Sequence, residues 1–80
     1  MELQIEEIDV AAGSALAGAQ IKDTGIRREL GIIVVAVKRG PAPMIFNPEP
    51  EMALAAGDIL ITLGHRDQLE RLEQLARPMG

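Results

Sequence analysis

The sequence predicts a small α+β domain with the element order β-α-β-β-β-α, in which a sheet carries two short helices and the chain pairs as a two-fold homodimer. Eighty residues suit a single domain spanning residues 1–80. Residues 32–37 and 59–63 are almost wholly apolar, as is typical of strands that are covered on both faces. Two short helices cover about one face of such a sheet, so we expect a copy of the chain to cover the other.

The first strand is expected over residues 2–10, because apolar and polar residues alternate there. The alternation changes phase at Glu6 and Glu7, where we expect a β-bulge. Residues 12–14 are expected to form a turn.

A short helix is expected over residues 22–30. Ile26 and Leu30 stand four positions apart, which places both on one side of a helix. Gly31 is expected to end this helix, because glycine accepts the positive φ that closes many helices.

Three strands are expected to follow. Residues 32–37 are rich in β-branched side chains, which favours a strand over a helix. Residues 44–46 lie between Pro43 and Pro48, so we expect a short strand at an edge of the sheet. Residues 59–63 are expected to form the last strand.

The longest helix is expected over residues 66–76. Leu69, Leu72, Leu75 and Ala76 fall on one side of this helix, and charged residues occupy the other. We expect the apolar side to pack on the sheet.

The composition excludes several classes of protein. A formal net charge of −4 and a single aromatic residue, Phe46, argue against nucleic-acid binding, which needs cations and stacking platforms. No apolar run approaches the ~20 residues of a membrane span, so we expect no direct membrane insertion. The chain has no cysteine, which excludes disulfides and cysteine zinc sites.

Catalysis finds little support, and we expect that the chain is not an enzyme. It contains one serine, two threonines and one histidine, His65, and no spacing pairs a nucleophile with a base. The carboxylate pairs at positions 6–7 and 49–51 offer oxygen ligands for a divalent cation, although solvated surface charge is their ordinary role. Asp58 is expected to be a turn residue that accepts backbone hydrogen bonds.

Basic residues gather in the middle of this acidic chain, where five of the eight lie between positions 22 and 39. Lys22 and Arg27 are expected to face an anion, which the dipole of the short helix would also favour. Two copies of Arg27 across a two-fold axis could hold a symmetric anion. Lys38 and Arg39 lie about 20 Å away, at about 3.3 Å per strand residue, and are expected to be solvated. The alternative is that all these cations are solvated or form ion pairs with Glu29.

Three segments together resemble the RCK-C domain, also called TrkA-C, over nearly the whole chain. They are GSALAG at 13–18, IKDTGIRRELGIIVVAVKRG at 21–40 and NPEPEMALAAGDILITLG at 47–64. The resemblance implies a dimeric regulatory domain of potassium channels and potassium or cation transporters on the cytoplasmic side of the membrane. It implies an upstream RCK-N lobe and a membrane subunit as partners. In some members of this family a small ligand binds at the dimer interface, most familiarly cyclic di-adenosine monophosphate, and others respond to cations. The resemblance therefore implies cyclic di-adenosine monophosphate or a divalent cation as candidate ligands.

The resemblance also indicates the ligand-binding residues. Ile21 and Lys22 take the positions of two aliphatic residues that sandwich a base, and Arg27 takes that of an arginine that contacts phosphate. Ile33 and Val34 take positions at which polar groups often read the ligand. These five residues form the predicted site at the dimer interface, and no catalytic or metal-binding residue is predicted.

Three departures from the family pattern bear on the function. Lys22 replaces an aliphatic residue, Gly25 replaces an acidic one, and Ile33 and Val34 cannot form hydrogen bonds with a base. Two interpretations follow: a ligand-sensing dimeric regulatory domain of a potassium channel or transporter, or a purely structural dimerisation module that binds no ligand. We expect the chain to be a fragment of a larger protein, with a stand-alone subunit as the alternative.

Overall fold

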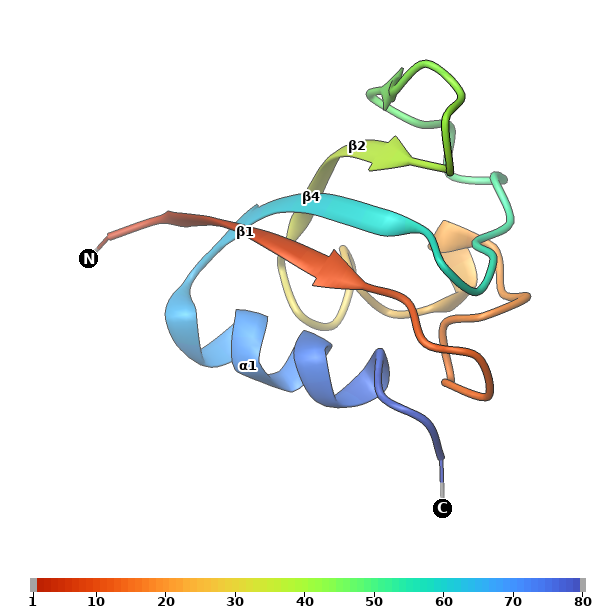
Figure 1. The fold of residues 1–80 in the computed structure, drawn as a ribbon. Helices are drawn as coiled ribbons and strands as arrows, with labels where there is room; N and C mark the ends of the chain where they lie inside the picture. The colour runs from red at the N-terminus through yellow and green to blue at the C-terminus, as the bar shows by residue number, and fades with distance from the viewer. Residues whose placement is uncertain (1, 80) are drawn as a thin grey trace.

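Four strands form one antiparallel sheet in a computed structural model that describes residues 2–79. They are β1 (Gln4–Asp9), β2 (Ile33–Lys38), β3 (Ile45–Phe46) and β4 (Ile59–Gly64), in the spatial order β1-β4-β2-β3. One α-helix, α1 (Arg66–Leu75), lies beneath the sheet in Figure 1. The α+β class is therefore confirmed, and so are the expected positions of the strands and of the last helix.

Strand β4 is the centre of the sheet, since it pairs with both β1 and β2. Leu60 and Thr62 are fully buried on the α1 side, whereas Ile61 and Leu63 are half-buried on the other side. The hydroxyl of Thr62 donates to the carbonyl of Glu6 at 2.8 Å, which satisfies this polar group within the core. An apolar sequence on both faces suits this central position.

The β-bulge expected at Glu6 and Glu7 is wrong, because β1 pairs regularly with β4. Its register with β4 runs without interruption from Gln4 opposite Gly64 to Asp9 opposite Ile59. Glu6 occupies a position on the α1 side, but β1 is an edge strand, so this carboxylate reaches water without a change of register. The irregularity lies instead in β2, between Val34 and Ala36.

The prediction of a helix over residues 22–30 is also wrong. A short 3₁₀ helix, η1 (Ile21–Asp23), is followed by turns up to Leu30. Gly25 has a φ of 81°, which is incompatible with a continuous right-handed helix. Ile26 and Leu30 are nevertheless buried, and Gly31 ends the segment with the expected positive φ of 69°. The apolar pair is therefore buried by a chain of turns, so the sheet carries one α-helix and not two.

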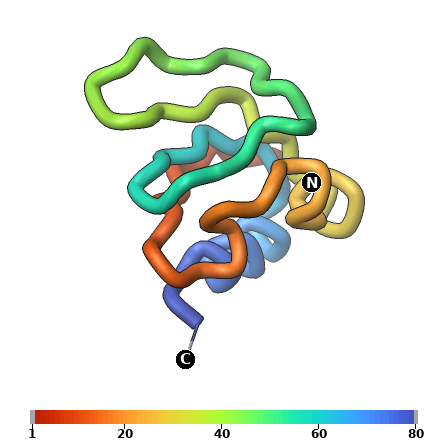
Figure 2. Tube along the Cα trace, turned by 90° about the vertical axis from the view of Figure 1, so that its right-hand side faces the viewer, coloured from red at the N-terminus to blue at the C-terminus, as the bar shows by residue number. Residues whose placement is uncertain are grey.

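The core lies between the sheet and the elements on its α1 side. Leu69 and Leu72 of α1 are buried against it, together with Ile26 and Ile32 from the turn segment. In Figure 2 the segment of residues 39–50, which includes β3 and is drawn in green, lies at the end of the molecule opposite α1.

The other face of the sheet is largely uncovered and apolar. Ile5 and Ile33 flank Leu63 in one row across the sheet, and Ile61 and Phe46 flank Ala36 in another. Ile5, Ile33 and Phe46 are 70%, 55% and 76% exposed. We call Ile5, Ile33, Phe46, Ile61 and Leu63 the open sheet face. Such a face was expected; the homodimer that would cover it stays a prediction.

Candidate functional site

The predicted ligand site lies on the segment of residues 20–34, which the backbone holds in a defined shape. The amide of Ile21 donates to the carbonyl of Met52 and that of Lys22 to the carbonyl of Pro50, both at 2.9 Å. The side chain of Thr24 donates to the carbonyl of Ile21 at 2.6 Å and accepts from the amide of Ile26 at 3.2 Å. Residues 21–26 are therefore fixed against the loop that precedes β4.

A second set of bonds joins the turns to β2. The amide of Gly31 donates to the carbonyl of Arg27, and the amide of Ile32 donates to the carbonyl of Ile26, each at 3.0 Å. These bonds close the chain on itself just before Ile33, the first residue of β2. Arg27 is therefore held near the beginning of β2, as the predicted site requires.

The five predicted residues divide by exposure. Lys22, Arg27 and Ile33 are exposed, whereas Val34 is half-buried against the core and Ile21 is only 8% exposed. In the single chain the side chain of Ile21 is part of the hydrophobic core and lies below the surface. The exposed part therefore combines two cations with one apolar side chain of the open sheet face.

Lys22 and Arg27 have no acidic partner among residues 2–79, where the ion pairs are Arg39–Asp58 and Arg66–Glu70. Within these residues Glu29 forms no ion pair with either cation, contrary to the alternative expectation. The expectation that a helix dipole favours an anion here is also wrong, because η1 has only three residues and too small a dipole. Attraction of an anion at this surface therefore depends on the two side chains themselves.

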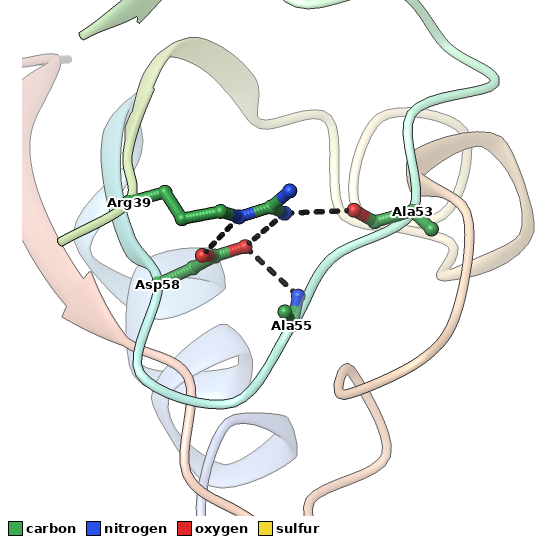
Figure 3. Close-up of polar contacts among 4 residues, drawn as sticks. All are labelled: Arg39, Ala53, Ala55 and Asp58. Atoms are coloured by element: carbon green, nitrogen blue, oxygen red, sulfur yellow. Dashed lines mark hydrogen bonds and ion pairs between the residues drawn. The ribbon is translucent and has the colours of Figure 1, made fainter. Parts of the chain in front are cut away.

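The expectation that Arg39 is solvated is wrong, because its guanidinium is bonded to Asp58 (Figure 3). Its Nε donates to Oδ1 of Asp58 at 2.8 Å, and its Nη2 donates to Oδ2 at 2.7 Å and to the carbonyl of Ala53 at 3.0 Å. Oδ2 of Asp58 also accepts the amide of Ala55 at 2.8 Å, so the expected backbone hydrogen bond of Asp58 is confirmed. The network fastens the end of β2 to the loop of residues 53–58.

Asp58 is 1% exposed, so its charge depends on these partners. The hydrogen bond from Arg39 lowers the pKa of Asp58, and this effect together with the amide of Ala55 outweighs burial, which acts in the opposite direction. The same hydrogen bond raises the pKa of Arg39. One indication of this pair is visible in the sequence, an acidic residue immediately before a buried strand, but its partner depends on the strand register.

No cluster of three or more histidine or acidic side chains suited to a metal ion occurs within residues 2–79. Over the same residues, none of the helical segments combines the length and apolar character needed to cross a membrane.

Comparison with known proteins gives a family match over most of the chain. Residues 5–77 match the profile of the TrkA-C domain. Potassium channel protein 1 of Methanocaldococcus jannaschii is 39% identical over 54 residues, which cover 68% of this chain and 16% of that protein. Ktr system potassium uptake protein C of Bacillus subtilis is 36% identical over 67 residues, 84% of this chain and 30% of that protein. The chain thus spans less than a third of either relative.

Solved structures show the same fold. The RCK C domain of the potassium transport protein KtrA, in complex with cyclic diadenosine monophosphate, is 42% identical with a TM-score of 0.78, covering 90% of this chain and 81% of that one. The RCK_C domain dimer of Streptococcus agalactiae BusR with the same ligand is 25% identical with a TM-score of 0.79, covering 91% and 89%.

Proposed function

Because this chain belongs to the TrkA-C domain family, also called RCK-C, we propose that it is a ligand-sensing, dimeric regulatory domain of a potassium channel or of a potassium or cation transporter. Its relatives include a potassium channel protein and a potassium uptake protein. The role is regulatory and not catalytic. We further propose that residues 1–80 are one domain of a longer protein at the cytoplasmic side of a membrane, with an RCK-N lobe and a membrane subunit as partners.

The observation that carries this proposal is the presence, on the segment that leads into an exposed apolar strand, of two exposed cations without an acidic partner among residues 2–79. Arg27 is exposed close to the beginning of β2, where Ile33 is 55% exposed, and Lys22 is exposed on η1 of the same segment. A protein with a net charge of −4 has few surfaces that attract an anion. The cations of this surface would attract an anion, and its apolar side chain would contact a ring system of the bound ligand.

Dimerisation through the open sheet face would complete the site. Contiguous exposed apolar surface on a small domain is typical of an interaction site, and a two-fold axis places the same patch on both partners. Ile33 belongs both to this face and to the predicted ligand site, so two copies would bring two Arg27 side chains toward a shared ligand. A structural neighbour, the RCK_C domain of BusR, was solved as a dimer, which supports dimerisation as such.

The proposed ligand is a small anion with two phosphates, with cyclic di-adenosine monophosphate as the first candidate. Both the KtrA and the BusR neighbours were solved with that molecule. Ile33 offers apolar contact, and neither Ile33 nor Val34 offers a side-chain hydrogen bond to a base edge. Affinity in this chain would therefore depend on phosphate contacts from Arg27 and Lys22, and selectivity among bases would be weak. A divalent cation is the second candidate.

A ligand bound across the two-fold axis would act by shifting the population of two dimer arrangements. It must bind one arrangement more tightly than the other, because equal affinity shifts nothing. The attached domains would transmit the change in angle between the two copies to a gate.

Isothermal titration calorimetry with cyclic di-adenosine monophosphate and with Mg²⁺ tests the proposal. Arg27→Ala should weaken binding of the dinucleotide by about ten-fold to a hundred-fold, as expected for loss of a charge-assisted hydrogen bond to phosphate in each copy. Arg28→Ala is the matched control, since Arg28 is also exposed and adjacent in sequence. Equal losses in both variants would reject the assignment of Arg27.

The alternative function is a structural dimerisation module without a ligand, which the apolar residues Ile33 and Val34 favour. Dimerisation in sedimentation experiments, together with no heat of binding from nucleotides or divalent cations, would support this alternative.

A further inference from the structure

Strand β1 leaves one side of its backbone free. Within residues 2–79 it pairs with β4 alone, and Figure 1 shows it as an outer strand of the sheet. Beyond its end, the amide of Val10 donates to the carbonyl of Asp58 at 2.8 Å. Because successive residues of an antiparallel strand direct their backbone groups to opposite sides, the even-numbered residues bond to β4. The backbone groups of Ile5, Glu7 and Asp9 therefore point outward as unpaired donors and acceptors.

A groove runs along this free side, between β1 and α1. Its larger part has a volume of about 540 Å³ and is lined by Glu6 of β1 and by Glu70 and Glu73 of α1, among others. A second part of about 260 Å³ is lined by Glu7, Asp9 and again Glu73. The two parts share Glu73 and both follow β1, so we call them together the β1–α1 groove.

The charge of the groove identifies what it can accept. Five residues with carboxylates and two arginines, Arg66 and Arg77, border the groove, which gives a formal balance of −3. By strand alternation the side chains of Glu7 and Asp9 lie on the same face as Ile5, so the carboxylates on the α1 side are those of Glu6, Glu70 and Glu73. Arg66 already lies 3.7 Å from Glu70. A second copy of β1 would place carboxylates opposite carboxylates, which disfavours pairing of this edge with itself. A cationic segment next to β1 would instead place positive charges opposite these carboxylates, which favours binding.

We propose that the β1–α1 groove binds an extended cationic peptide segment, which joins the sheet as a fifth strand next to β1. Backbone groups of Ile5, Glu7 and Asp9 would supply the ladder, and affinity would come from main-chain hydrogen bonds as in other cases of strand addition. Side chains of a strand alternate between faces, so every second residue of the segment would lie over Glu6, Glu70 and Glu73. The preferred segment therefore carries lysine or arginine at alternate positions.

This site is independent of the proposed ligand site. Strand β4 separates β1 from β2, and none of the groove carboxylates belongs to the segment of residues 20–34. Loss of anion binding in Arg27→Ala would leave peptide binding intact, and the reverse also holds.

The probe is a nine-residue peptide in which arginine alternates with threonine, followed by fluorescence anisotropy on the full chain. A peptide of the same composition with all its arginines adjacent is the first control, and a glutamate–threonine peptide is the second. The alternating cationic peptide should bind most tightly, and its affinity should fall as salt screens the carboxylates. Equal affinity for the two arginine peptides would overturn strand addition.

A proline substitution separates strand addition from charge attraction. Glu7→Pro removes an outward N–H without affecting the ladder to β4, whereas Glu7→Thr removes the same charge and keeps that donor. Glu7→Pro should bind the peptide about five-fold to ten-fold more weakly than Glu7→Thr, as loss of one backbone hydrogen bond implies. Circular dichroism confirms that both variants are folded. Equal affinity, or a change of self-association in Glu7→Pro, would overturn the proposal.

A charge reversal gives a second test that does not alter the strand. Glu73→Lys should weaken peptide binding by about five-fold or more at low salt, because Glu73 lines both parts of the groove. Glu51→Lys makes the same change of net charge at an exposed position outside the groove. Equal losses in the two variants would show that net charge alone controls binding, and would overturn the assignment to the groove.

Discussion

Arg39 and Asp58 extend the pairing of β2 with β4 by one position, through two parallel hydrogen bonds of 2.8 and 2.7 Å between guanidinium and carboxylate. The last registered pair of these strands is Lys38 opposite Ile59. Asp58 is almost fully buried, whereas the side chain of Arg39 is 44% exposed. The pair also reaches Ala53 and Ala55, so it connects the sheet to the loop that supports Ile21 and Lys22.

Removal of Arg39 should destabilise the fold, because it leaves the buried carboxylate of Asp58 with only the amide of Ala55. We expect Arg39→Ala to lower the free energy of unfolding by about 2 kcal/mol, between the values for a neutral hydrogen bond and a fully buried ion pair. Arg66→Ala is the control: its 3.7 Å pair with Glu70 is exposed on both sides, and surface pairs contribute about 0–1 kcal/mol. Urea denaturation measures both, and equal effects would contradict the structural role of Arg39.

The pair should also make stability depend on pH in the acid range. The folded pKa of Asp58 is lowered, below the value of about 3.9 in the unfolded chain. Between these two values the unfolded chain binds more protons, so stability rises with pH. The contribution is therefore complete above about pH 5, and it is lost as pH falls through the folded pKa.

Asp58→Asn provides the comparison for this pH dependence. The difference in unfolding free energy between the original chain and Asp58→Asn should be constant near neutral pH and should shrink below about pH 4. Urea denaturation at several pH values measures it. A difference that grows toward acid pH would show that the pKa of Asp58 is raised and not lowered.

Gly31 has a φ of 69° and open space where a Cβ would lie. The cost of a side chain there is thus conformational and not a steric clash with neighbours. Gly31→Ala should lower the free energy of unfolding by about 1–2 kcal/mol. Gly31→Asn should cost less, because asparagine tolerates the left-handed region. Thermal unfolding compares the two variants, and equal losses would point to a cause other than backbone strain.

The proposed dimer predicts that a charge on the open sheet face prevents self-association. Ile33→Glu would place a carboxylate within the proposed apolar interface, where its burial is unfavourable, and should shift sedimentation toward the monomer. Met79→Glu is the control, since Met79 is 74% exposed but lies outside the sheet. A chain that is already monomeric at micromolar concentration would remove the basis of the prediction.

Local patterns in the sequence were sufficient for the regular elements. The leucines of residues 66–76 predicted α1, and the apolar residues of 59–63 predicted a central strand, because burial of side chains at a fixed period is a local property. Gly31 was assigned correctly because the positive φ that glycine accepts is also a local property of the chain. The helix expected over residues 22–30 failed at Gly25, where tertiary packing selects turns that still bury Ile26 and Leu30.

The candidate site likewise has some features that the sequence predicts and others that only the tertiary structure reveals. The sequence by itself determined the fold class, the family and the position of the cationic segment, because each can be read from local motifs and from their order along the chain. Only the tertiary structure decided that Arg39 pairs with Asp58, that Ile21 lies in the core and that β1 is a free edge. These outcomes depend on strand register and strand order, which bring together residues far apart in sequence and which no local pattern encodes.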